Sequence, residues 1–233
     1  MNKPVCVIVG VGPGNGAAFA HKFGANGYQV ALLSRNMEYL NSLANEIGDA
    51  KAYRCDATNT NQIKAAFKTI NAEMGVVELL IYNAGSGVFV NIDDTTIDDF
   101  ERSWRINTLG LLVAAQQVLP DMRRSGTGTI IVTGATASLR GNVHTAPFAP
   151  AKAAQRSLAQ SIAKHAGPDG IHVAYVILDG SVGPALGGKH VADSADNELL
   201  HPNDIADTYY HLSQQKKSAW TFELDLRPYV EKW

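Results

Sequence analysis

The sequence predicts an α/β protein built on a doubly wound parallel sheet of about seven strands, with helices on both faces. Two observations support this prediction. Short β-branched runs alternate with longer amphipathic stretches along almost the whole chain, which is the pattern of parallel strands joined by helices. The 233 residues are also 45% hydrophobic and only 18% charged. We therefore expect residues 1–233 to form one domain with a sizeable core.

Seven segments have the apolar, β-branched character of buried strands. In chain order they are Val5–Gly10, Gln29–Ser34, Lys51–Cys55, Glu78–Asn83, Thr129–Thr133, His172–Leu178 and Trp220–Leu224. The segments between them repeat apolar residues at helical spacing, and the expected helices are Asn15–Asn26, Glu38–Ile47, Asn61–Met74, Asp98–Arg124, Thr145–Ala166 and Asn203–Gln214. The last is introduced by Pro202-Asn203-Asp204, which is a helix start signal.

The segment Gly180–Leu200 lacks clear periodicity and is rich in Gly, Ser, Asp and Ala. A loop of this length inside a compact domain is usually a functional lid or a mobile segment. We therefore expect residues 180–200 to form a substrate loop. The alternative is a surface insertion without a role.

The charge pattern argues against nucleic acid as a partner. The formal net charge is −2, and basic residues are scattered except for short pairs such as Arg123-Arg124 and Lys216-Lys217. No basic stripe is therefore present that could neutralise a phosphate backbone.

The cysteine content argues against a metal site or a disulfide framework. Only Cys6 and Cys55 occur, with no C-x-x-C motif and no paired His and Cys spacing, so we expect two buried free thiols in a reducing compartment. The apolar run Val5–Val9 is interrupted at once by glycines, which fits neither a signal peptide nor a membrane span. We expect a cytoplasmic protein that does not enter a membrane.

A glycine-rich turn follows the first strand and leads into the first helix. It reads Gly10-Val11-Gly12-Pro13-Gly14-Asn15-Gly16. In this context glycines let the backbone approach a pyrophosphate, whose charge the helix N-terminus stabilises. Pro13 removes one backbone N–H from this cradle. The turn therefore indicates a Rossmann-type dinucleotide site with one donor fewer.

The ends of the next strands indicate which dinucleotide is bound. The second strand ends at Ser34-Arg35, where an NAD site would present a carboxylate to the ribose 2′-hydroxyl. An arginine there can instead pair with a 2′-phosphate, which favours NADP(H). The alternative is that Arg35 is a solvated residue at a helix entry. Asp56 closes the third strand and Asn83-Ala84-Gly85 closes the fourth, so we expect the binding crevice at this edge of the sheet.

Taken together, these motifs resemble those of the short-chain dehydrogenase/reductase family over nearly the whole chain. The glycine motif of the family matches Gly10, Gly14 and Gly16, its adenine-contacting Asp matches Asp56, and its N-A-G motif matches Asn83-Ala84-Gly85. The resemblance implies a cofactor site formed by Gly10, Gly14, Asn15, Gly16, Ser34, Arg35, Asp56, Ala57, Asn83, Ala84, Gly85 and Lys152. It also implies a small-molecule substrate and a homodimer or homotetramer formed through a four-helix face.

The resemblance fails at the catalytic centre. Asn107 matches the active-site asparagine of the family, but its Tyr-x-x-x-Lys motif reads Phe148-Ala149-Pro150-Ala151-Lys152 here. The serine position is occupied by Ala135, and the Pro-Gly after the sixth strand is Asp179-Gly180. The chain thus resembles a divergent subgroup with Phe in place of Tyr, and its 220–228 tail is similar to that subgroup too.

The missing tyrosine has a specific chemical consequence. In the family, the tyrosine hydroxyl exchanges a proton with the substrate, and the lysine lowers its pKa and holds the nicotinamide ribose. A phenyl ring has no proton to give, and losing a positioned acid typically costs about 10²- to 10⁴-fold in rate. The first substitute is His144, one helical turn before Phe148, with Thr136, Ser138 and Asp179 behind it. The alternatives are an exposed His144 at the helix entry and a Phe148 that serves only packing.

Two functions follow from these residues. The first is an NADP(H)-dependent oxidoreductase with a non-standard active site, in which Asn107, Lys152, His144 and Thr136 are the catalytic candidates. Its substrate would carry a carbonyl, a hydroxyl or an activated double bond. The second is a catalytically silent NADP(H)-binding sensor or scaffold, associating through the apolar stretches Leu111–Ala115 and Ala149–Ala154. For these stretches, packing on the sheet of the same chain is the alternative.

Overall fold

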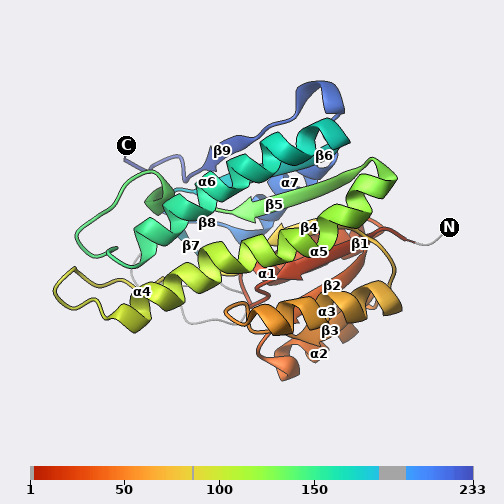
Figure 1. Cartoon of the computed structure of the whole chain (residues 1–233), viewed down its shortest axis with the longest axis horizontal. Helices are drawn as coiled ribbons and strands as arrows, with labels where there is room; N and C mark the ends of the chain where they lie inside the picture. Colours follow the sequence, from red (N-terminus) through yellow and green to blue (C-terminus); the bar gives the residue numbers. More distant parts are fainter. Residues whose placement is uncertain (1–2, 86, 184–197, 233) are drawn as a thin grey trace.

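The computed structural model describes residues 3–85, 87–183 and 198–232. Its main sheet has seven strands in the order β3-β2-β1-β4-β5-β6-β9, and every neighbouring pair is parallel (Figure 1). The strands are β1 (Val5–Val9), β2 (Gln29–Ser34), β3 (Ala50–Arg54), β4 (Val77–Tyr82), β5 (Gly128–Thr133), β6 (Ile171–Leu178) and β9 (Glu223–Leu226). The predicted doubly wound parallel sheet is confirmed.

The strand order reverses at β1, which pairs with β2 on one side and with β4 on the other. The chain leaves β1 toward β2 and β3, then crosses back to β4 and continues outward to β9. Ligands of open α/β sheets bind beyond the carboxyl ends of the strands at such a reversal. The fold therefore places a binding crevice after β1 and β4.

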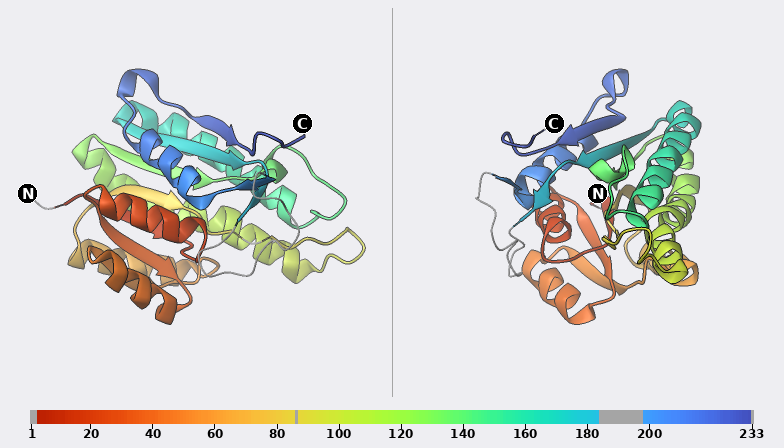
Figure 2. Two further views of the ribbon diagram at one scale, coloured as in Figure 1. Left: turned by 180° about the vertical axis from the view of Figure 1, so that it is seen from behind. Right: turned by 90° about the vertical axis from the view of Figure 1, so that its left-hand side faces the viewer.

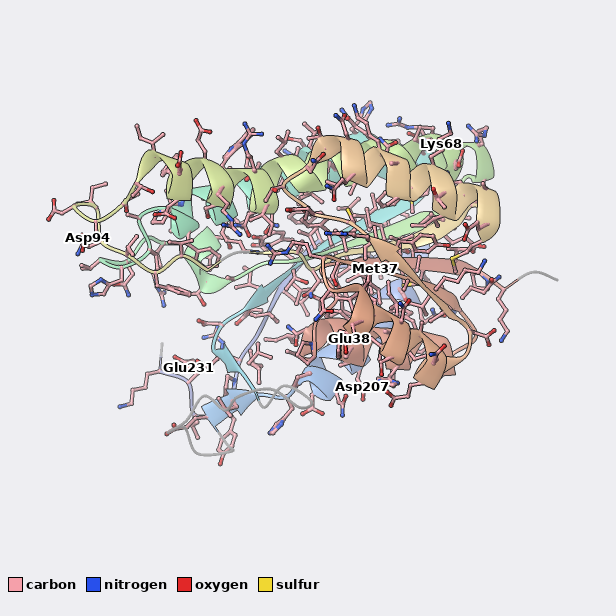
Figure 3. The ribbon with its side chains drawn as sticks, turned by 90° about the horizontal axis from the view of Figure 1, so that it is seen from below. Met37, Glu38, Lys68, Asp94, Asp207 and Glu231 are labelled. Atoms are coloured by element: carbon pink, nitrogen blue, oxygen red, sulfur yellow. The ribbon has the colours of Figure 1, made fainter. Side chains whose placement is uncertain are left out.

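Two layers of helices cover the sheet, as the end-on view of Figure 2 shows. The helices α3 (Thr60–Glu73), α5 (Gly110–Ser125) and α6 (Phe148–Ala166) pack on one face, whereas α1 (Asn15–Ala25), α2 (Met37–Ile47) and α7 (Pro202–Ser213) pack on the other. Figure 3 labels Lys68 on α3 in one layer and Glu38 on α2 in the other. The sheet side chains are therefore buried on both faces, which explains why the strands read as continuous apolar runs.

The predicted helix Asp98–Arg124 is wrong as one regular helix. The chain forms α4 (Ile97–Trp104), then a π-helical segment over Arg105–Leu109, then α5. The wider π turn leaves carbonyl groups open to side chains, and the Tyr82 hydroxyl donates to the Ile106 carbonyl at 2.6 Å. Gly110 permits this approach, because a Cβ there would lie 2.0 Å from the Tyr82 oxygen. Short π segments of this kind often occur at functional sites.

Two other expected boundaries are also wrong. The last strand is Glu223–Leu226 rather than Trp220–Leu224, because the preceding segment is fastened by side chains. The Trp220 indole stacks on the His172 ring with centroids 5.0 Å apart, and the Thr221 N–H donates to the Gln215 amide oxygen at 2.8 Å. Helix α6 begins at Phe148 rather than Thr145, since Asn142 and Thr145 form a hydrogen-bonded turn before it.

The ends of the predicted substrate loop pair with each other. The two-residue strands β7 (Ser181–Val182) and β8 (Leu199–Leu200) form a small parallel sheet, which the sequence analysis does not predict. Residues 184–197 of the loop lie outside the described residues. Among the helices of the described ranges, none is long and apolar enough to cross a membrane.

Candidate functional site

A cleft of about 220 Å³ lies beyond the carboxyl ends of β1, β2, β3 and β4. It contains eight of the predicted cofactor residues, namely Gly10, Ser34, Arg35, Asp56, Ala57, Asn83, Ala84 and Gly85. Val9, Val11, Gly12, Leu33, Cys55 and Ile106 complete its lining. The predicted residues Gly14, Asn15 and Gly16 lie beside this cleft, at the beginning of α1.

Two glycines let the chain turn tightly between β1 and α1. Gly10 has φ +94°, and a Cβ there would lie 2.4 Å from the Ala84 nitrogen. A Cβ on Gly16 would lie 2.6 Å from the Val11 Cα atom. Both positions therefore exclude a side chain. Gly12 lines the cleft, and a Cβ there would have no atom within 4 Å.

The beginning of α1 has the properties of an anion site. Gly14 is its N-cap, and no side chain caps the helix. The Ala17 N–H donates to the Gly12 carbonyl, so the N–H groups of Asn15 and Gly16 are the ones available to an anion. The Asn15 Oδ1 atom and the Ser34 hydroxyl are both buried without a hydrogen-bond partner among the described residues. Buried polar oxygens normally have partners. These two atoms and the uncapped helix therefore fit a polar ligand that carries phosphate and hydroxyl groups.

Two charged residues also line the cleft, Arg35 after β2 and Asp56 after β3. Burial alone would raise the pKa of Asp56, but the net effect is a lowered pKa, because the Thr58 N–H and hydroxyl donate to its carboxylate at 2.9 and 2.8 Å. Arg35 and Arg102 lower it further by their positive charge. Asp56 is therefore ionised at neutral pH, and the exposed Arg35 places a cation at the rim of the cleft.

The Asn83 side chain is used within the fold. Its amide nitrogen donates to the Gly10 carbonyl at 2.8 Å, and its oxygen accepts from the Thr133 hydroxyl at 3.1 Å. Thr133 also lies 2.9 Å from the Tyr209 hydroxyl. This chain of bonds ties β1, β4, β5 and α7 together. Asn83 thus shapes the floor of the cleft, and Ala84 and Gly85 face the ligand space.

Asn107 and Lys152 come together beside Gly85, as the resemblance implies. A Cβ on Gly85 would lie 3.3 Å from the Asn107 Oδ1 atom and 3.7 Å from the Lys152 Nζ atom. Lys152 is 5% exposed, and its Nζ donates to the Thr133 carbonyl at 2.8 Å and to the Gln155 amide oxygen at 3.0 Å. Burial lowers the pKa of Lys152 to about 7. The amine and ammonium forms are therefore both accessible near neutral pH.

Gln155 belongs to this site although the sequence analysis does not single it out. It is fully buried, and its amide nitrogen donates to the Asn107 carbonyl at 2.8 Å. A signal does exist in the sequence. Gln155 lies three residues after Lys152 on the stripe of α6 that also carries Ala159 and Ile162. A polar residue on a buried stripe requires partners.

Phe148 forms a wall of a second cavity of about 440 Å³, next to Lys152. Its ring centroid lies 5.9 Å from the Lys152 Nζ atom and 5.4 Å from the Phe89 ring centroid. Ala135, Leu178 and Gly180 also line this cavity, and so does Glu231, which Figure 3 labels in the C-terminal tail. The cavity thus has aromatic rings on the Phe148 side and polar side chains elsewhere, among them Arg140 and Asn142.

The structure brings Thr136 into this second cavity but not His144. Thr136 is among the lining residues, and its hydroxyl donates to the Asp179 carboxylate at 2.5 Å. Asp179 in turn forms an ion pair of 3.2 Å with Arg227. Because its hydrogen is directed to Asp179, Thr136 offers the cavity an acceptor oxygen. His144 is exposed in the turn before α6 and lines neither cavity.

Metal chemistry finds no support in the described ranges, where no group of three His, Cys, Asp or Glu residues could hold an ion. The other two substitutes for the missing acid line neither cavity. The Ser138 side chain is buried beside Tyr175, and the Asp179 carboxylate pairs with Thr136 and Arg227. The Lys152 Nζ atom lies next to Gly85, which lines the first cleft, and 5.9 Å from the ring centroid of Phe148, which lines the second.

Comparisons with known proteins agree with this geometry. A family model described as short chain dehydrogenase matches residues 4–190. An uncharacterized oxidoreductase of Staphylococcus aureus strain USA300 is 27% identical over 230 residues, which cover 98% of each chain. A short-chain dehydrogenase structure from Rhodopseudomonas palustris is 35% identical, covers 97% of this chain and 99% of that chain, and has a TM-score of 0.82. A metagenomic short-chain oxidoreductase in complex with NADP is 24% identical, with a TM-score of 0.84 and 99% of both chains covered.

Proposed function

Because the chain belongs to the short-chain dehydrogenase family, we propose that this oxidoreductase uses NADP(H) on a small carbonyl, alcohol or activated double bond. The observation that carries the proposal is the placement of Lys152 between residues that line two separate spaces. One is a cleft with an uncapped helix N-terminus and a cationic rim, and the other is a cavity lined by Phe148 and Phe89 and by polar side chains such as Thr136 and Asn142. The volume of the second cavity, about 440 Å³, fits a small organic molecule.

The cofactor preference rests on Arg35. We propose that the first turn of α1 with Asn15 holds the pyrophosphate, that Ser34 and Arg35 hold the 2′-phosphate, and that Asp56 and Ala57 face the adenine. An exposed guanidinium can form a bidentate ion pair with a phosphate, whereas a ribose hydroxyl carries no charge and cannot form such a pair. The structurally similar metagenomic oxidoreductase is in complex with NADP. This neighbour agrees with NADP(H) as the cofactor.

Lys152 is the residue that we propose to move the proton. A reduced nicotinamide, when bound, would supply the hydride for the substrate carbon. The substrate oxygen must then gain a proton, which Phe148 cannot give. The Lys152 ammonium has N–H groups to donate, and its lowered pKa makes that donation favourable near neutral pH. Thr136 adds a polar group to the second cavity, Asn107 lies beside Gly85 of the cleft, and His144 would contribute only after a movement of its turn.

The oligomer is a separate part of the proposal. The apolar stretches predicted to associate are largely used inside the chain, since Leu111, Ala114 and Ala115 are at most 1% exposed. Exposed apolar side chains lie instead on α4, where Phe100 and Trp104 are 45% and 43% exposed. We propose that a second copy covers this α4 face. Sedimentation of Trp104→Lys against wild type tests it, and an unchanged mass would contradict it.

The experiment that tests the enzyme is a two-step assay. NADPH binding is first followed by the fluorescence of the nicotinamide. Its oxidation is then measured on a panel of aldehydes, quinones and enones, and NADP⁺ reduction on a panel of alcohols. We expect binding together with turnover of at least one class. Binding without turnover on any panel would instead support the sensor or scaffold, and the absence of binding would contradict both.

A further inference from the structure

We propose that Gln155 is a positioning residue for Lys152: it fixes the direction in which the lysine nitrogen exchanges its proton with the cleft. The inference deepens the proposed function and rests on it for the role of Lys152 in proton transfer. Its structural basis is a buried chain of hydrogen bonds from the π segment to the end of β5. That chain runs through Asn107, Gln155, Lys152 and Thr133.

The orientation of the Gln155 amide is determined by its neighbours. A backbone carbonyl can only accept a hydrogen bond, so the bond of 2.8 Å to the Asn107 carbonyl must be donated by the amide nitrogen of Gln155. The amide oxygen then faces the other way, toward the Lys152 Nζ atom at 3.0 Å and the Tyr175 hydroxyl at 3.3 Å. Gln155 therefore always presents an acceptor to the lysine.

The π segment makes this arrangement possible. In a regular α-helix the carbonyl of Asn107 would accept from the backbone N–H four residues later. Asn107 lies within the π-helical residues Arg105–Leu109, and its carbonyl accepts from a side chain of α6. The Tyr82 hydroxyl serves the neighbouring Ile106 carbonyl in the same way. Tyr82 and Gln155 thus both bind the π segment. The Asn107 carbonyl in turn fixes the position of the Gln155 amide.

The Lys152 nitrogen keeps the same two bonds in both charge states. Its tetrahedral positions comprise the bond to Cε, the N–H to the Thr133 carbonyl at 2.8 Å, and the N–H to Gln155 at 3.0 Å. The fourth position carries a third hydrogen in the ammonium form and a lone pair in the amine form. Gly85, which lines the cleft, lies next to this nitrogen. We infer that the proton is exchanged at this fourth position.

The proton balance of a carbonyl reduction fits this geometry. The substrate carbon gains a hydride from the reduced nicotinamide, and the substrate oxygen gains the proton of the fourth N–H bond of Lys152. The lysine becomes an amine and retains both bonds to Thr133 and Gln155, and solvent protonates it again afterwards. No hydrogen bond inside the protein has to change, so the network is organised in advance for the transfer.

The ionisable groups packed around the Lys152 amino group are neutral or paired. Tyr175 faces it from β6, and Tyr209 from α7 acts through Thr133; burial raises the pKa of both phenols, so both are neutral. Arg156 on the next position of α6 is paired with Glu223 at 2.5 and 2.8 Å. No carboxylate of the described residues contributes to the lowered pKa of Lys152, which comes from burial. A charge placed at position 155 would therefore have a large effect.

The test compares two substitutions that change the acceptor in opposite ways. Gln155→Glu puts a carboxylate beside the nitrogen, which should raise the titration midpoint of Lys152 by about 1 to 3 pH units. Gln155→Leu removes the acceptor and lowers the midpoint. The midpoint is read in the protein without cofactor, from the ¹³C resonance of lysines labelled at Cε. Lys152→Met assigns the signal by its disappearance.

Gln160→Glu is the matched control, since it places the same charge five residues further along α6 and should leave the midpoint unchanged. Gln155→Met replaces the leucine variant if the latter does not fold. Midpoints that stay at the wild-type value, or that move in the same direction in both folded variants, would overturn the proposal. NADPH titrations of the same samples test the proposed function separately, because the midpoint is measured without the nucleotide.

Discussion

The Lys152 amino group lies over the face of the Phe148 ring, with 5.9 Å between Nζ and the ring centroid. The Phe148 ring also packs against the Phe89 ring, with the two ring planes tilted by 59°. A buried cation next to an aromatic face gains a weak electrostatic attraction. Phe148 therefore combines packing in the cavity wall with a place beside the proton-carrying residue.

Phe148→Tyr should raise activity toward simple carbonyls. The new phenol would lie near the Lys152 ammonium, which lowers the phenol pKa and makes it a competent acid. We expect kcat/KM with NADPH and aldehydes to rise by at least about 10-fold. The double variant with Ala135→Ser should exceed it, because it adds a second donor to the developing oxyanion. Phe89→Tyr is the control, and an equal gain there would contradict a specific effect at position 148.

Arg35→Asp should reverse the cofactor preference. The wild-type guanidinium favours the 2′-phosphate of NADP(H), whereas a carboxylate repels that phosphate and can accept from the two ribose hydroxyls of NAD(H). We expect NADPH affinity to fall by about 10- to 100-fold and NADH affinity to rise. Lys68→Asp changes the net charge equally from the outer side of α3, and it should leave both affinities unchanged (Figure 3). Equal affinities in the wild type would contradict the assignment of Arg35.

Lys152→Met should change how stability depends on pH. Burial lowers the Lys152 pKa from 10.5 to about 7 in the folded protein, so between these values the unfolded chain binds more protons. The unfolding free energy of the wild type therefore rises with pH across this window, by about 1.4 kcal/mol per pH unit from this residue. Urea unfolding of the wild type and of Lys152→Met at pH 7.5 and 9 measures this contribution as the difference between their unfolding free energies. A difference that does not vary with pH would mean that Lys152 titrates at its ordinary value.

Gly10→Ala and Gly12→Ala should separate folding from binding. At Gly10 an added methyl group would meet the Ala84 nitrogen at 2.4 Å, and φ is +94°. We expect the unfolding free energy to fall by at least about 2 kcal/mol. At Gly12 the methyl group meets nothing within 4 Å but enters the cleft, so NADPH affinity should fall while stability changes by less than about 0.5 kcal/mol. A stable Gly10→Ala protein would contradict the packing argument.

The sequence is sufficient to predict the sheet because its strands are buried on both faces and therefore read as apolar runs. It is also sufficient for the cleft, since polar residues such as Asp56 and Asn83 follow directly after those runs. The break between α4 and α5 could not be predicted in this way. The π segment depends on Tyr82 and Gly110, which are far apart in the sequence and meet only in the folded chain.

The orientation of Lys152 could not be predicted from the sequence either. The spacing of Phe148 and Lys152 places both on one face of α6, and that much follows from helical geometry. The orientation of the lysine depends on the Thr133 carbonyl and on Gln155, whose own amide is held by the Asn107 carbonyl. Residues whose partners are backbone atoms of other elements carry no motif. His144 illustrates the converse, because sequence proximity to Phe148 does not bring it into the cavity.

The ion pair between Arg227 and Asp179 has a consequence for biosynthesis. Arg227 follows β9, the last strand of the sheet to be made, whereas all the residues of the nucleotide cleft lie before position 107. Because the ribosome makes the chain from its N-terminus, the cleft can assemble while the partner of Asp179 is still unsynthesised. The Asp179 carboxylate, and the Thr136 hydroxyl bound to it, therefore reach their final arrangement only after the sheet is closed. A nascent chain would accordingly contain every residue that lines the cleft before the second cavity can be completed.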